Sequence, residues 1–228
     1  MIIIGYIASL IIGISLGLIG GGGSILTVPV LVYLMGVDPV LATAYSLFIV
    51  GATSLAGVVP KYKQGLVNLK TAVIFGLPAI LAVFLTRKYI IPAIPDELFS
   101  LGEFVFTKSI LLMVLFAVLM VFASISMIRG KKEEEASDTK QVFNYPMIFL
   151  EGSVVGVLTG LVGAGGGFLI IPALVILSKL PMKQAVGTSL LIIAAKSLIG
   201  FTGDIGNITI DWMLILIITG LAVVGIFI

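Results

Sequence analysis

Long apolar runs, separated by short polar stretches, make up most of the chain. The runs cover residues 3–20, 24–36, 39–60, 69–87 and 104–129 in the first part of the sequence, and 146–163, 167–180, 183–203 and 209–228 in the second. Several reach the roughly 18 residues that a helix needs to cross a hydrocarbon core about 30 Å thick. Because the runs do not alternate between apolar and polar positions, they predict membrane helices and not the strands of a barrel.

The sequence contains an internal repeat. Residues 17–57 align without a gap on residues 160–200, and about 18 of the 41 positions are identical. The shared positions are mainly glycine clusters, a proline six residues after each cluster, and Ser-Leu pairs, a pattern that apolar bias alone does not produce. We therefore predict an all-α polytopic membrane protein of two homologous repeats, residues 1–130 and 146–228, joined by a cytoplasmic polar linker over residues 131–145.

The second repeat has one predicted helix fewer than the first. A counterpart of the run at 104–129 is expected after 209–228, but the chain ends inside an apolar run, "GLAVVGIFI". Two interpretations stay open: the family form is shortened here, or the chain is a truncation.

Glycine clusters interrupt the first apolar segment of each repeat, at 20–23 and 163–167. A single helix over residues 3–36 would be about 50 Å long, at about 1.5 Å per residue, and would overshoot the bilayer. Glycine is roughly 1 kcal/mol less favourable than alanine inside a helix. The clusters therefore predict broken or re-entrant helices at these two places.

A helix break inside the membrane frees backbone amides, which survive only where protein or a wet cavity covers them. The half-helix that follows carries roughly half a positive charge at its N-terminus and binds anions without a charged side chain. The alternative is that the glycines only allow close helix packing. Packing calls for a glycine every fourth residue, as at Gly152, Gly156 and Gly160, so the runs of glycine favour the anion site.

The positive charges predict an orientation. If each broken segment turns back on itself, the repeats are inverted relative to each other, the N-terminus lies outside, and Lys and Arg divide nine to three. The nine are Lys61, Lys63, Lys70, Arg129, Lys131, Lys132, Lys140, Lys179 and Lys183, and the three are Arg87, Lys88 and Lys108. This excess fits a cytoplasmic face. If the broken segment crosses once, the division is seven to five and does not discriminate.

Composition narrows the function. The chain is 60% hydrophobic and 11% charged with a mean hydropathy of +1.29, far from the values of soluble domains. Cysteine and histidine are absent, which excludes disulfides, thiolate or imidazole metal sites, and nucleophiles activated by imidazole. We therefore expect no enzyme activity, no cofactor, no metal and no nucleic-acid partner, and a lipid bilayer as the surroundings.

The motifs "GLIGGGGSILTVP", "GLVGAGGGFLIIP" and "AVGTSLLI" resemble those of the sulfite exporter TauE/SafE family of membrane permeases. The resemblance covers both halves and implies a multi-pass secondary transporter of the plasma or inner membrane. Its cargo would be small sulfur-containing organic or inorganic anions such as sulfite or sulfonates, moved by alternating access. The resemblance leaves open which anion, the direction, the coupling ion and the oligomeric state. The alternative is a membrane channel or structural subunit whose glycines serve packing only.

The predicted substrate site combines the half-helix starts with hydroxyl side chains and one lysine: Gly21, Gly22, Gly23, Ser24, Ser46, Gly165, Gly166, Gly167, Thr188, Ser189 and Lys196. Tyr45 stands where the second half has Thr188, so the two half-sites are chemically unequal. Serines and threonines in membrane helices also bond back to their own helix, which is the competing interpretation for the hydroxyls.

Lys196 lies deep in an apolar run, where a charge is costly and needs a reason. It shares a helical face with Ser189. Lys196 either provides the countercharge for an anion, or snorkels outward, or pairs with Asp204.

Overall fold

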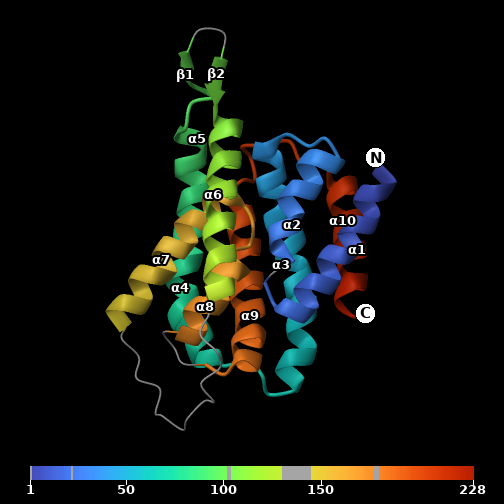
Figure 1. Cartoon of the computed structure of the whole chain (residues 1–228), viewed down its shortest axis with the longest axis vertical. Coiled ribbons are helices and arrows are strands. Elements are labelled where there is room, and N and C mark those ends of the chain that lie inside the picture. Colours follow the sequence, from blue (N-terminus) through green and yellow to red (C-terminus); the bar gives the residue numbers. More distant parts are fainter. Residues whose placement is uncertain (1, 22, 102–103, 130–144, 177–179) are drawn as a thin grey trace.

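The computed structural model describes residues 2–21, 23–101, 104–129, 145–176 and 180–228 (Figure 1). In the first repeat, the helices are α1 (Ile2–Ile19), α2 (Ser24–Pro29), α3 (Pro39–Lys63), α4 (Leu69–Leu85), α5 (Ile91–Ala93) and α6 (Lys108–Arg129). Two π-helical segments, η1 (Val30–Leu34) and η2 (Thr86–Ile90), extend α2 and α4. The second repeat has α7 (Tyr145–Val162), α8 (Gly167–Ile176), α9 (Met182–Thr202) and α10 (Trp212–Ile226). The polar linker lies almost wholly outside the described residues.

The helices suit a membrane. Within the described residues, three stretches are long and apolar enough to cross it, Pro39–Lys63, Leu69–Ala93 and Met182–Thr202, and shorter apolar helices accompany them. Large apolar side chains such as Phe122 and Leu150 are about two-thirds exposed, at 66% and 64%. Such side chains are stable outside a protein core when lipid surrounds them, so the prediction of a helical membrane protein is confirmed.

Both predicted breaks are present. The first helix of each repeat ends at the glycine cluster, and a new helix begins at Ser24 and at Gly167. Gly20 and Gly163 have φ angles of +74° and +72°, a left-handed conformation that glycine adopts without steric cost. The second break is one residue shorter than predicted because Gly167 is already helical.

The chain turns back after the first break. Met35, which follows η1, lies against Gly5 near the start of α1: a Cβ on Gly5 would be 2.9 Å from the Met35 Cγ. The segments Ser24–Leu34 and Gly167–Ile176 are about 15 Å long, at about 1.5 Å per residue, and too short to cross a bilayer alone. The path of the chain at the first break is the one that a re-entrant segment would follow.

Two segments differ from the sequence-based prediction. The run at 104–129 is not one helix: residues Phe104–Thr107 form strand β2, which pairs antiparallel with β1 (Glu97–Leu101). Aromatic and β-branched residues in "FVFT" favour a strand once a partner strand is available, and Phe99 stacks on Phe106 across the pair. The run at 69–87 continues helically through η2 and α5 to Ala93.

The two repeats pack reciprocally. Helices α3 and α9, which are equivalent in the repeat, run antiparallel, because Gly57 lies by Leu190 and Gly200 lies by Leu47. In addition, α4 packs on α7 and α10 packs on α1, so the fourth helix of each repeat covers the first helix of the other (Figure 1). Each repeat therefore completes the core of its partner.

Matching hydrogen bonds extend this symmetry beyond the aligned sequence. The backbone N–H of Asn68 donates to the Thr188 hydroxyl at 3.0 Å, and the backbone N–H of Asp211 donates to the Tyr45 hydroxyl at 2.9 Å. Both pairs of positions are related by the repeat offset of 143 residues, as Gly20 is to Gly163. Asn68 and Asp211 also cap the N-termini of the helices that follow them. The same loop docking thus occurs once in each repeat, with different side chains.

The molecule has two distinct ends. The end of α3 and the starts of α4 and α9 form one of them, here the lysine end, which carries the described residues Lys61, Lys63, Lys70 and Lys183 (Figure 1). The start of α3, the β hairpin and the 203–211 loop form the other, here the hairpin end. Lys131, Lys132, Lys140 and Lys179 lie outside the described residues.

Candidate functional site

The two glycine breaks meet inside the protein. A Cβ placed on Gly21 would overlap the backbone of Gly167, and a Cβ on Gly167 would overlap the backbone of Gly21. Both residues are buried. The close approach shows that the breaks serve packing at this point, whichever further role they have.

The remaining glycines of each break pack on equivalent positions. Gly20 lies against Val186 of α9, and Gly163 lies against Thr43 at the equivalent position of α3. Likewise Gly23 packs on Leu16, and Gly166 packs on Thr159, again a repeat pair. The same backbone arrangement therefore occurs at both breaks, but the side chains that face it differ between them. Gly22 lies outside the described residues.

The second break carries a buried amine. The Lys196 side chain is fully buried, and its Nζ donates to the Thr159 hydroxyl at 3.0 Å. The same Nζ is 2.7 Å from the place that a Cβ on Gly166 would take, so the missing side chain of this glycine makes room for the amine. Lys196 neither snorkels outward nor pairs with Asp204 in this structure. It points into the second break, next to the predicted half-helix start.

Backbone amides at the second break are only partly used. The N–H of Gly163 donates to the Thr159 carbonyl at 2.9 Å, and that of Gly166 donates to the Ala164 carbonyl at 2.6 Å. The N–H groups of Ala164 and Gly165 donate to no acceptor within the part of the chain that the structure describes. Unpaired buried donors cost free energy, which an anion would recover.

The predicted hydroxyl residues have different environments. Ser24 and Ser189 lie at the breaks, but their hydroxyls donate to backbone carbonyls, Ser24 to Gly21 at 2.6 Å and Ser189 to Val186 at 2.8 Å. The Ser46 hydroxyl is buried and has no partner among the described residues. Thr188 is not brought to the breaks, because its hydroxyl holds the loop before α4 as described above. Of the four, Ser46 is the one with its donor unused.

Sequence reasoning missed Arg87. It was expected at the water-exposed end of a helix, but the helical path continues through η2 to Ala93 and leaves Arg87 fully buried. Its Nη1 donates to the Thr43 hydroxyl at 3.1 Å and lies 3.5 Å from Oδ2 of Asp204. Gly163 of the second break packs on Thr43, so Thr43 lies between Arg87 and the second break. An arginine inside the apolar stretch Leu69–Ala93 was the available signal.

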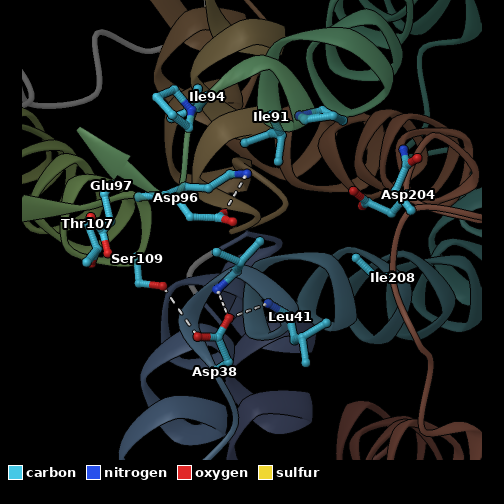
Figure 2. A pocket seen from close by; sticks show the side chains of 15 residues that line it. Asp38, Leu41, Ile91, Ile94, Asp96, Glu97, Thr107, Ser109, Asp204 and Ile208 are labelled. Carbon is cyan, nitrogen blue, oxygen red and sulfur yellow. Dashed lines mark hydrogen bonds and ion pairs between the residues drawn. The ribbon is translucent and has the colours of Figure 1, made fainter.

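Asp204, which follows α9, lies between Arg87 and a cavity. It is 3% exposed, and burial raises the pKa of its carboxyl while the Arg87 guanidinium acts in the opposite direction. The cavity has a volume of about 780 Å³ at the hairpin end, and Figure 2 shows the Asp204 carboxylate on its wall. Asp204 therefore connects the hairpin end to the buried guanidinium.

Three other charged groups of the cavity wall, Asp38, Asp96 and Lys108, have partners in the structure. Asp38 accepts hydrogen bonds from the backbone of Val40 at 2.8 Å and from the Ser109 hydroxyl at 3.3 Å, and Lys108 lies 3.7 Å from Asp96 (Figure 2). The second break thus has two fully buried basic side chains, Lys196 and Arg87, and a single carboxylate near them within the described residues. Among those residues, the structure holds no cluster of metal-ligating side chains. This arrangement suits an anion.

Comparisons with known proteins identify the family of the chain. The family model of the sulfite exporter TauE/SafE matches residues 5–228. A probable membrane transporter protein of Xylella fastidiosa is 33% identical over 207 residues, which cover 89% of this chain and 73% of the relative. The probable membrane transporter protein YdhB of Bacillus subtilis is 27% identical, over 90% of this chain and 79% of the relative. No solved structure matches the chain.

The family model covers nearly the whole chain, both glycine breaks included, and the relatives cover most of it. The apolar helices fit a membrane protein, and internal repeats occur in many transporters. The chain therefore belongs to the sulfite exporter TauE/SafE family and is a membrane transporter.

Proposed function

We propose that the protein is a secondary transporter for small sulfur-containing anions, such as sulfite or sulfonates, in the plasma or inner membrane. The observation that carries this proposal is the buried Lys196 amine, which faces a half-helix start and has the Thr159 hydroxyl as its partner in the described part of the chain. An oxyanion is the ligand that complements such a site. The sulfur-anion class comes from the sulfite exporter TauE/SafE family.

The second break has the groups to hold the anion. Lys196 provides charge, and the amides of Ala164 and Gly165 provide donors that have no acceptor among the described residues. The N-terminus of α8 adds its partial positive charge. In this closed arrangement, Gly21 and Gly167 touch, so binding requires the two breaks to separate.

The repeats provide a means of separation. Antiparallel α3 and α9 and the matching docking of the 64–68 and 203–211 loops support two inverted repeats, which exchange access between the two faces of the membrane. The lysine end is then cytoplasmic. Single cysteines at Lys61 and Lys183, in this chain that lacks native cysteine, should resist an impermeant thiol reagent added outside intact cells. Labelling at either position would contradict this orientation.

One observation favours the alternative of a channel or structural subunit. The contact between Gly21 and Gly167 and the packing of Gly20, Gly23, Gly163 and Gly166 on neighbouring helices are what glycines used for packing alone would show. That alternative explains the glycines. It gives no reason for a buried lysine beside them.

A thermal-shift screen of the purified protein separates these functions. Sulfite, thiosulfate, sulfoacetate and taurine are added separately, with chloride at equal ionic strength as the control. A true ligand at 100 times its Kd adds about 2.7 kcal/mol of apparent stability. Stabilisation by at least one sulfur anion beyond chloride is expected. If none stabilises the protein, or if Lys196→Met is stabilised as much as the wild type, the proposed site is wrong.

A further inference from the structure

The Arg87–Asp204 pair lies beside α3, between the end of this helix that lines the cavity and the part that contacts the second break. Val40 and Leu41, in the first turn of α3, line the cavity. Thr43 accepts the hydrogen bond from Arg87, and Val50 faces Gly165. Thr43 and Val50 are about 10 Å apart along the helix, at about 1.5 Å per residue. One face of α3 thus passes the cavity, the buried ion pair and the glycine break in that order.

The Arg87 guanidinium is incompletely paired. Its Nη1 contacts Thr43 and Asp204, but its Nε and Nη2 are buried without a hydrogen-bond partner among the described residues. Oδ2 of Asp204 likewise has no hydrogen bond of good geometry there. A guanidinium offers five donors in a planar fork that matches two oxygens of an oxyanion. The pair therefore holds Arg87 in place while leaving most of its donors unused.

We propose that Arg87 is an anion-binding residue between the cavity and the second break, and that the Asp204 carboxylate occupies its place until an anion replaces it. This inference rests on the proposed function for the identity of the anion, but not for the existence of the site. Asp204 is itself an oxyanion on the wall of the cavity. An incoming anion exchanges with it at Nη1, and the unpaired Nη2 and Nε add their donors.

In this proposal, the Arg87–Asp204 pair closes the path from the cavity to the second break until the exchange takes place. While Asp204 lies against Arg87, both side chains are buried, and so is the unused Ser46 hydroxyl, about one turn further along α3. When the carboxylate moves away, the next donors on the path are Ser46 and the amides at the second break. The anion then passes from Arg87 toward Lys196.

The test measures anion affinity by titration calorimetry on the purified full chain, with sulfite, thiosulfate and inorganic phosphate as probes. Asp204→Asn removes the competing charge and should raise affinity about tenfold, the factor that corresponds to about 1.4 kcal/mol. Asp96→Asn is the matched control, because Asp96 lines the same cavity but pairs with Lys108. It should change affinity less than twofold.

A second variant guards against misfolding. Arg87→Met alone would leave a buried carboxylate unpaired, so Arg87→Met is combined with Asp204→Leu, because replacing both members of a buried pair is tolerated better than removing one. The double variant should keep its melting temperature within a few degrees and lose at least tenfold in anion affinity.

An accessibility measurement supplies an independent readout. Ser46→Cys should react slowly with a small charged thiol reagent. When Asp204→Asn is added, the reaction should be about tenfold faster, because about 1.4 kcal/mol corresponds to a factor of ten. Asn207→Cys, on the cavity wall, should react equally fast in both backgrounds.

The outcomes separate the two proposals. If phosphate binds with the expected dependence on Asp204 while no sulfur anion binds, the sulfur-anion proposal falls and the Arg87 site stands. If sulfite binds the wild type, but Asp204→Asn and Asp96→Asn alter its affinity equally, the Arg87 site falls and the proposed function stands. Unchanged Ser46→Cys labelling, or retained affinity in the double variant, also overturns the Arg87 site. If none of the probes binds, both proposals fall.

Discussion

The first and second glycine breaks have the same backbone and different chemistry. At the first break, Gly20 packs on Val186 and Gly23 packs on Leu16, both apolar. At the equivalent places of the second break stand Thr43, which holds Arg87, and Thr159, which holds Lys196. The counterpart of Lys196 is Thr53, whose hydroxyl bonds back to its own helix at 2.7 Å. Ser24 and Ser189 donate hydroxyl hydrogen bonds at the first break, but no basic side chain lies there within the described residues. Two copies of one scaffold therefore yield one basic break and one uncharged break.

This difference shows what the repeat does and does not fix. The glycines, which set the path of the chain, are shared by the two copies. Among the described residues, basic side chains lie beside the second break alone. Many transporters are built from two similar repeats around one substrate site. We expect the uncharged first break to be the surface against which the basic second break closes.

The largest expected effect tests whether the two glycine breaks are structurally equivalent. Gly20→Ala and Gly163→Ala should each destabilise the protein by about 2–5 kcal/mol, from left-handed backbone strain of about 1–2 kcal/mol and overpacking of about 1–3 kcal/mol. The control is Gly220→Ala in α10, where an added Cβ meets no atom within 4 Å. Melting in detergent measures all three. A large loss for one break and none for the other would show that the two are not equivalent.

The next effect would sharpen the chemical difference. Lys196→Met should weaken binding of a sulfur anion by about 1.5–3 kcal/mol, the range for a hydrogen bond to a charged group, with little change in melting temperature. Thr53→Val, at the equivalent position of the first repeat, should leave the affinity unchanged. Calorimetric titration with sulfite compares the variants. Equal losses in both would mean that the anion site does not belong to the second break.

The smallest effect concerns pH at the ion pair beside the second break. Burial raises the pKa of Asp204, so acidification neutralises this carboxyl at a higher pH than it would an exposed one. The neutral form no longer competes for Arg87, so anion affinity should rise as pH falls. A sulfonate is the suitable probe, because its own charge stays constant over the range.

The control for this pH effect is Asp204→Asn, in which the rise should be absent. Asp38, Asp96, Glu97 and Lys108 also line the cavity and remain in both proteins, so any shared pH dependence belongs to them. A rise of equal size in the variant would remove Asp204 from the explanation. A fall in affinity on acidification would contradict the exchange at Arg87.

The sequence by itself determined the features that depend on local physics. Uninterrupted apolar runs require lipid around helices, and glycine runs break a helix wherever they occur, so the membrane helices and both breaks were predictable. The repeat was visible because its glycines, prolines and serines recur at a constant spacing. Lys196 was predicted as a site residue because a charge deep in an apolar run is costly without a function, and its part in binding stays a prediction.

Tertiary structure alone decided which side chains meet. Arg87 looked like a helix-end charge because the predicted apolar run, 69–87, ends there. In the structure, η2 and α5 continue the helix beyond it. Thr188 was predicted as a site residue and Tyr45 as the position that makes the half-sites unequal; the structure adds that each hydroxyl holds the loop that precedes the fourth helix of a repeat. The chemical inequality of the breaks depends on contacts between residues more than 100 positions apart. Such contacts are set by how the helices pack, and the order of residues along the chain does not encode them locally.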